Sequence, residues 1–325
     1  MKLPVEQVMA ALRRPSRWRA WEVVAWVLIW AAPLVFAQHA ALINEIAILA
    51  LFALSLDLVL GYAGIVSLGH AAFFGLGAYG AALFAKHLMP DPLVGLVVGT
   101  LLGALLGALT SPMIVRGTDL TRLMVTMGVA LVLYELANRF DGLTGGADGL
   151  QGVVIGPLLG RFEFDLGARV ASFYSLTVLF VVFVVMRVVV HSPLGMSVQA
   201  LRDNRLRLAA MGHSVNARLA AVYTVAGGIA GAAGALLAQT TGFASLDVFD
   251  FHRSADVMLA LIIGGAGWLW GGLLGAVAFK LMHDLLSAIT PQYWTFWIGL
   301  FLVLLMLVGR DRLFRPARWF ARSRR

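Results

Sequence analysis

The chain has 325 residues, of which 60% are hydrophobic and only 13% are charged. A soluble domain carries roughly twice that charged fraction, so the composition indicates a polytopic membrane protein and excludes a soluble globular one. The absence of cysteine excludes a disulfide framework, a thiolate metal site and a cysteine nucleophile.

The net charge of +8 is concentrated at the two ends of the chain. Clusters of basic residues that adjoin membrane spans favour contact with the bilayer rather than with nucleic acid, and the positive-inside rule places both termini in the cytoplasm. We therefore expect a basic N-terminus (1–20), a transmembrane permease domain (21–309) and a basic C-terminus (310–325), with an even number of crossings. The N-terminal clusters are Lys2, Arg13, Arg14, Arg17 and Arg19, and the C-terminal ones Arg310, Arg312, Arg315, Arg318, Arg322, Arg324 and Arg325.

Apolar runs predict the spans in chain order. A glycine-rich segment at 139–170 is expected outside, and a polar loop at about 191–216 is expected in the cytoplasm. "GGAGW" at 264–268 interrupts the run 257–286, which gives two short spans or a re-entrant pair. The fold class is all-α, with about eight to ten transmembrane helices and broken or re-entrant segments. The expected spans are 21–38, 41–60, a third from the stretch at 61–83, 92–115, one ending near 138, 171–190, one ending near 239, 257–286 in two parts, and 294–308.

The stretch "GYAGIVSLGHAAFFGLGAYGAAL" at 61–83 has irregularly spaced glycines. Irregular glycines predict backbone bent out of regular helix, which membranes tolerate only where protein or a water-filled cavity covers it. A substrate pathway would have that property, so Tyr62, Gly64, Ser67, Gly69 and His70 are candidate pathway residues. A hydrogen-bonded structural role is an equal alternative for His70, and Asp57, Glu45 and Glu135 are further ionisable residues within spans.

Two other sets of glycines repeat every four residues. At that spacing the glycines lie on one helical face and allow a second helix to approach closely, so we expect them to serve helix packing. The two sets are Gly95, Gly99, Gly103 and Gly107, and Gly267, Gly271 and Gly275.

Motifs of nucleotide and hydrolytic chemistry are missing from the sequence. There is no G-x-x-x-x-G-K-[ST] phosphate loop, no H-E-x-x-H and no G-x-S-x-G. Ser67 beside His70 is a weak nucleophile and base pair with no evident orienting group. We expect a transport subunit that is not an enzyme and binds no cofactor or metal.

Within the polar loop, Val198, Leu201, Leu208 and Met211 approximate one face of a short helix, and Gly212 fits its C-terminal cap. An apolar face in a cytoplasmic loop favours docking into a groove of a soluble partner over a solvated linker.

Four motifs occur in an order and spacing that resemble the permease subunits of ABC importers for branched-chain amino acids, the LivM type. They are "LDLVLGYAGIVSLGHAAFFGLGAYGAAL", "LTGGADGLQGV", "ALRDNRLRLAAMGHSV" and "LIIGGAGWLWGGLLGA". The resemblance covers roughly 45–310. It adds Thr144, Gly145 and Gly146 to the candidate pathway and assigns ATPase coupling to Arg202, Asp203, Arg205, Ala209, Ala210 and Gly212. Arg207 and Leu208 stand where the family's acidic residue precedes the alanines.

The resemblance implies two cytoplasmic ATPase subunits, a second homologous permease, a periplasmic solute-binding protein and a place in the inner membrane. Similar permeases import urea or short-chain amides, which is one alternative. A stand-alone ion-coupled carrier, with Asp57 as its buried acid, is another, and a passive channel is a third.

Overall fold

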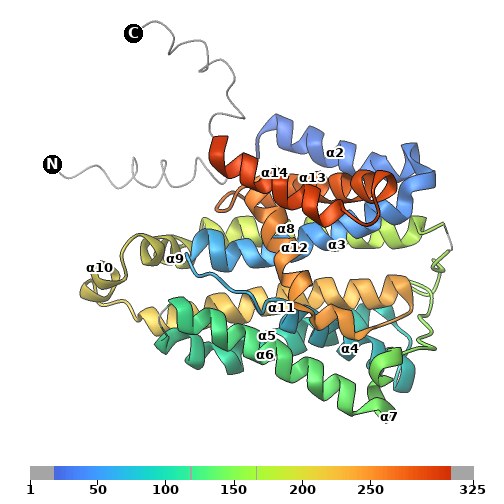
Figure 1. Ribbon diagram of the computed structural model, residues 1–325, viewed down its shortest axis with the longest axis horizontal. Helices are drawn as coiled ribbons and strands as arrows, with labels where there is room; N and C mark the ends of the chain where they lie inside the picture. The colour runs from blue at the N-terminus through green and yellow to red at the C-terminus, as the bar shows by residue number, and fades with distance from the viewer. Residues whose placement is uncertain (1–17, 118, 166, 309–325) are drawn as a thin grey trace, which may run out of the picture. The chain divides into compact units, whose positions relative to one another are not determined.

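The computed structural model describes residues 18–308, apart from 118 and 166 (Figure 1). Except for Arg19, the basic residues of the two terminal clusters lie outside this described part. The chain divides into two compact units, Met1–Ala276 and Val277–Arg325. All regular secondary-structure elements of the described residues are helices, which confirms the all-α class.

The helices follow one another with short connections, apart from the segment between α6 and α8. In chain order they are α2 (Ala20–Val35), η2 (Ala37–His39), α3 (Ala40–Asp57), η3 (Leu58–Tyr62), α4 (Ala71–His87), α5 (Pro92–Arg116), α6 (Asp119–Arg139), α7 (Asp141–Thr144), η4 (Gly146–Asp148), α8 (Arg169–Val190), α9 (Pro193–Asp203), α10 (Arg205–Ala210), α11 (Val215–Thr241), η5 (Leu246–Phe249), α12 (Phe251–Gly264), α13 (Leu269–Ile289) and α14 (Trp294–Val308).

Each expected span corresponds to a helix. Six described helices are long and apolar enough to cross a membrane, namely Ala37–Tyr62, Pro92–Val115, Leu120–Arg139, Arg169–Val190, Val215–Thr241 and Leu269–Ile289. The other four, α2, α4, α12 and α14, have 16, 17, 14 and 15 residues, and a crossing takes about 20. The chain is a multi-pass membrane protein that combines six long apolar helices with four shorter ones among the described residues.

Helix α11 is the centre of the first unit, where α4 and α5 pack against it (Figure 1). A Cβ at Gly103 would overlap the carbonyl of Gly227, and one at Gly107 the carbonyl of Tyr223. The α5 glycine row therefore serves helix packing, as expected. The second row is only partly as predicted, because Gly267 lies outside α13 in a turn with φ +82°, whereas Gly271 and Gly275 face α12.

A buried ion pair joins α2 to α8. Arg187 Nη1 lies 2.9 Å from Glu22 Oε2, and both side chains are almost fully buried. The guanidinium also lies over the Trp18 ring at 4.8 Å from its centroid. Two charges buried together in this way stabilise each other, because removal of one deprives the other of its oppositely charged neighbour.

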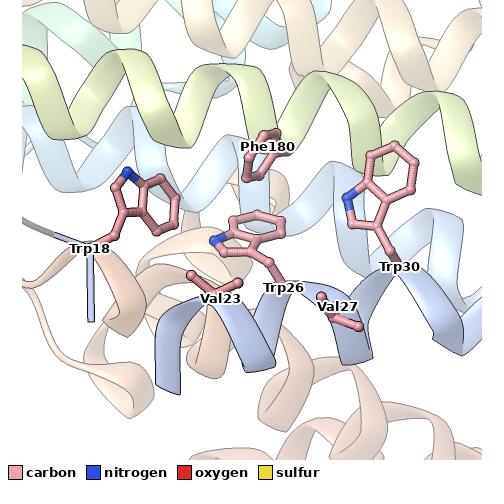
Figure 2. Close-up of a pocket in the computed structure, with 6 residues that line it drawn as sticks. All are labelled: Trp18, Val23, Trp26, Val27, Trp30 and Phe180. Carbon is pink, nitrogen blue, oxygen red and sulfur yellow. The ribbon is translucent and has the colours of Figure 1, made fainter. Parts of the chain in front are cut away.

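Beside this pair, tryptophans of α2 and Phe180 of α8 line an apolar hollow of about 450 Å³ (Figure 2). A second cavity of about 700 Å³ lies among α5, α8 and α11, and its wall is also almost entirely apolar. Specific sites for small polar molecules place a few polar groups in such a wall. Neither cavity therefore suits the ammonium and carboxylate groups of a free amino acid.

Candidate functional site

Helix α3 unwinds at its end, in the stretch that the irregular glycines singled out. Leu58–Tyr62 forms a π-helical turn, and residues 63–70 lack regular helix until α4 begins at Ala71. Gly64 takes a left-handed conformation with φ +70°, which favours glycine. The predicted break is confirmed, and π-turns of this kind are frequent at functional sites.

Protein covers most of this unwound segment. Ile65, Ser67, Gly69 and His70 are buried, whereas Gly64 and Val66 are exposed. A Cβ at Gly69 would overlap the backbone of Thr126 in α6. Irregular backbone at membrane depth must be covered by protein or line a water-filled cavity, and the buried side of this segment meets that requirement.

His70 pairs with Ser55 and not with Ser67. Its Nε2 lies 2.8 Å from the Ser55 hydroxyl, which also lies 2.6 Å from the Phe52 carbonyl. The hydroxyl has a single proton, so donation to the carbonyl leaves its oxygen to accept from Nε2–H. The ring is fully buried and stacks on Phe52 at 5.5 Å. The Ser67–His70 pair considered from the sequence does not form, because residues 63–69 are not helical.

A second break lies between α12 and α13, where "GGAGW" predicted one. Gly265 and Gly267 have φ +99° and +82°. The backbone N–H of Gly267 donates to Asp57 Oδ1 at 2.6 Å, across 210 positions of sequence. Asp57 is fully buried at the end of α3, and its Oδ2 has no hydrogen-bond partner among the described residues.

Arg202 of α9 connects the polar loop to both breaks. Its Nη1 donates to the carbonyl of Gly61 in the π-turn. Its Cγ lies 2.8 Å from the position of a Cβ on Gly64, and its Nη1 lies 3.1 Å from that on Gly267. Arg202, predicted for partner coupling, thus contacts Gly64, predicted for the pathway. The two candidate sites meet at one point.

The predicted docking helix is in fact two helices with different faces. Asn204 interrupts it with φ −162° and ψ 106°, and its side chain caps α10 by accepting from Arg207 N at 2.9 Å. Val198, Leu201 and Leu208 are buried in the body of the protein. The interpretation of that apolar face as a partner surface was wrong for these three residues, which cover the chain's own helices, whereas Met211, the fourth residue of the face, is exposed.

A different set of side chains is available for a partner. Leu206 is 83% exposed and Met211 is 59% exposed. Asp203, Ala209, Ala210 and Gly212 are exposed beside them, and Arg205 is half-buried. Exposed apolar residues gathered on a polar loop mark a binding surface. We refer to Leu206, Ala209, Ala210, Met211 and Gly212 as the α10 surface.

Thr144, Gly145 and Gly146 lie at the far end of α6 from the unwound segment. The Thr144 hydroxyl donates to the Phe140 carbonyl at 2.8 Å, and both glycines have positive φ. They shape the turn that ends α6. At about 1.5 Å of rise per residue, the part of α6 between Thr126 and this turn is roughly 20 Å long. Figure 1 shows α7 and the α9–α10 pair at opposite ends of the helices.

Helix α6 carries an exposed face that the sequence did not single out. It is the most exposed of the six long helices. Leu120, Met124 and Leu131 are more than half exposed, and Glu135 is also exposed near its end. Contact of an ionisable side chain with lipid is costly, so such a face favours protein or water as its neighbour. An acidic residue, Glu135, within an otherwise apolar span was the available signal.

No metal centre is evident in the described part of the chain, where no three histidine or acidic side chains gather. The fold and the site thus define a multi-pass membrane protein with two intramembrane breaks joined to an exposed polar loop. Such an arrangement is typical of a transport subunit.

The family model described as branched-chain amino acid transport system / permease component matches residues 39–309, and the chain belongs to this family. It is 28% identical over 281 residues to the high-affinity branched-chain amino acid transport system permease protein LivM of Salmonella typhimurium, covering 78% of this chain and 64% of that protein. It is 26% identical, with the same coverage, to LivM of Escherichia coli K12. The chain thus spans less than two thirds of the length of these relatives. No solved structure matches.

Proposed function

We propose that this chain is the membrane-spanning permease subunit of an ATP-driven importer for branched-chain amino acids. The family supports transport as the class of function. The α10 surface is the observation that carries the ATP-driven part. It is held to the body through buried Leu201 and Leu208 and exposes Leu206 and Met211. A short helix of this kind fits a groove on a cytoplasmic ATPase subunit.

The α6 face supports a second permease subunit as partner. Its exposed Glu135 would be costly against lipid alone. A homologous subunit facing α6 would cover this residue and enclose a pathway between the two chains. Because Gly69 holds the unwound segment against α6, that pathway would pass Gly64 and Val66 and end near Thr144. A periplasmic binding protein would deliver the amino acid at the α7 end.

This arrangement gives the protein a place in the inner membrane with both termini in the cytoplasm. The α9–α10 pair would then lie on the cytoplasmic side and α7 on the periplasmic side. No ATP site is required in this chain, because the ATPase subunits bind and hydrolyse the nucleotide.

The test is reconstitution in proteoliposomes with an ATPase, a second permease and a binding protein from the same source as this chain. We expect uptake of radiolabelled leucine, isoleucine and valine that requires ATP and survives a protonophore. An ATPase whose phosphate-loop lysine is replaced is the control and abolishes uptake. Uptake of urea or acetamide in place of the amino acids would reassign the substrate.

The buried carboxylate of Asp57 in a broken helix is the observation that favours an ion-coupled carrier. Uptake by this chain alone, abolished by a protonophore and independent of ATP, would establish that function and refute the importer.

A further inference from the structure

Three segments far apart in the sequence meet at one cluster, which we call the Asp57–Arg202 junction. It comprises Asp57, Gly61, Gly64, Arg202 and Gly267. A Cβ at Gly61 would overlap both the Asp57 carboxylate and the Gly267 backbone, and Cβ atoms at Gly64 and Gly267 would crowd Arg202. The Asp57 and Arg202 side chains thus crowd the Cβ positions of all three glycines, so a larger residue at any of them would displace one of these side chains.

Each of the two side chains joins a different pair of segments. Asp57 accepts from Gly267 N at 2.6 Å and so ties the end of α3 to the α12–α13 break. Arg202 donates to the Gly61 carbonyl and so ties α9 to the π-turn. The polar loop is thus connected to both breaks by polar contacts.

The junction also offers Arg202 a second acceptor. Asp57 Oδ2 is buried and has no hydrogen-bond partner among the described residues, and the charge of Arg202 acts on this carboxylate. A buried carboxyl oxygen left without a hydrogen-bond partner is costly. Asp57 Oδ2 therefore offers the guanidinium a second acceptor besides the Gly61 carbonyl. Neither acceptor requires a change in the charge of Arg202.

We propose that the Asp57–Arg202 junction is the coupling element that converts movement of α9 into movement of the two intramembrane breaks. The proposal rests on the proposed function, in which an ATPase moves the α9–α10 pair. A shift of α9 carries Arg202 from the Gly61 carbonyl to Asp57 Oδ2, and the freed π-turn changes its position relative to α12 and α13. Asp57 and Arg202 are positioning residues in this scheme and do not contact the amino acid.

The experiment measures amino acid taken up per ATP hydrolysed in the reconstituted importer. We expect Asp57→Asn and Arg202→Gln to assemble with the ATPases and retain hydrolysis, but to lower this ratio by roughly fivefold or more, the lower end of coupling between linked sites. Arg202→Lys keeps the charge and should recover part of the ratio. Arg218→Gln, which removes a positive charge from the start of α11 outside the junction, is the matched control and leaves the ratio unchanged.

The double variant Asp57→Asn with Arg202→Gln tests whether the two residues act together. If they form one element, the double variant is no worse than the poorer single variant, whereas independent residues give additive losses. Should Asp57→Asn fail to accumulate, the ratios of Arg202→Gln and Arg202→Lys decide. A wild-type ratio in the variants, or a parallel loss of hydrolysis and uptake, would refute the coupling role of the junction but leave the proposed function intact. Absence of ATP-dependent uptake in the wild type overturns the proposed function instead.

Discussion

Gly64 and Arg202 are in contact although they belong to the unwound segment and to α9. A Cβ at Gly64 would lie 3.4 Å from the Cβ of Arg202, close to the separation of about 3.8 Å found in disulfides. Since the chain has no cysteine, we expect the pair Gly64→Cys with Arg202→Cys to cross-link in membranes under mild oxidation. The cross-linked peptide would be detected by mass spectrometry.

Gly64→Cys paired with Ala209→Cys is the control for this contact, because Ala209 lies on the exposed α10 surface. The left-handed backbone at Gly64 costs about 1 kcal/mol in both pairs. The control pair also keeps the Arg202 side chain against the new Cβ, so cross-linking is compared per amount of folded protein in the membrane. Equal cross-linking of the two pairs would show that α9 does not rest on the unwound segment.

Replacement of Gly69 should destabilise the protein. The sequence indicates the same role, that of a pathway residue, for Gly64 and for Gly69. The structure separates the two positions, because a Cβ at Gly69 overlaps the backbone of Thr126. We expect Gly69→Ala to lower the free energy of unfolding by roughly 1–3 kcal/mol, as overpacked sites do. The measurement is thermal stability in detergent by fluorescence-detected size exclusion.

Gly128→Ala is the matched control on α6, since nothing lies within 4 Å of its Cβ position. It should leave the stability of the isolated subunit unchanged or raise it by up to about 1 kcal/mol, because alanine is the better helix former. Equal stability of Gly69→Ala and Gly128→Ala would contradict the close approach of the unwound segment to α6.

Glu22→Gln should destabilise the contact between α2 and α8. The change leaves Arg187 buried without its charged partner, and loss of one member of a buried pair costs roughly 3–5 kcal/mol. We expect a lower melting temperature in detergent. The double variant Glu22→Gln with Arg187→Met removes both charges and should recover much of that loss. A double variant less stable than Glu22→Gln would show that Arg187 contributes independently of the pair.

Segments with a strong local signal were predictable from the sequence. Hydrophobic length gave the spans, and the glycines at 61–69 and 264–267 gave both breaks, because glycine supports the positive φ found at Gly64, Gly265 and Gly267. The break between α9 and α10 also had a local signal that went unused, since asparagine is a preferred N-cap and Asn204 caps α10.

Partners distant in sequence were not predictable from it. Nothing local indicates that Ser55 pairs with His70 or that Asp57 binds the backbone of Gly267, because these contacts depend on how separate helices pack. The prediction that the α9 apolar face points toward a partner failed for the same reason. Periodicity shows that Val198 and Leu201 share a face, but it does not show whether that face meets the chain's own helices or a partner.

Gly212 tests the α10 surface most directly. It follows α10 with φ +82°, and nothing lies within 4 Å of its Cβ position. The predicted left-handed conformation is confirmed, so a larger residue meets no steric overlap and only backbone strain. Gly212→Ala should be destabilised by about 1 kcal/mol and Gly212→Val by more, because a β-branched residue is poorly accommodated at positive φ.

If the α10 surface docks to an ATPase, that strain changes the exit of the chain from α10 and displaces Met211 from its groove. We expect Gly212→Val to lower co-purification of the co-expressed ATPases and amino acid uptake together, while the subunit alone keeps its size-exclusion profile. Gly160→Val is the matched control, since Gly160 has φ +69° with equally open surroundings and lies in the segment between α6 and α8. It carries the same strain and should leave ATPase co-purification unchanged. A solvated loop would absorb the change at Gly212 as easily as the segment around Gly160 does. Wild-type co-purification of Gly212→Val would therefore refute docking through the α10 surface, and with it the main structural reason to prefer an ATP-driven importer over an independent carrier.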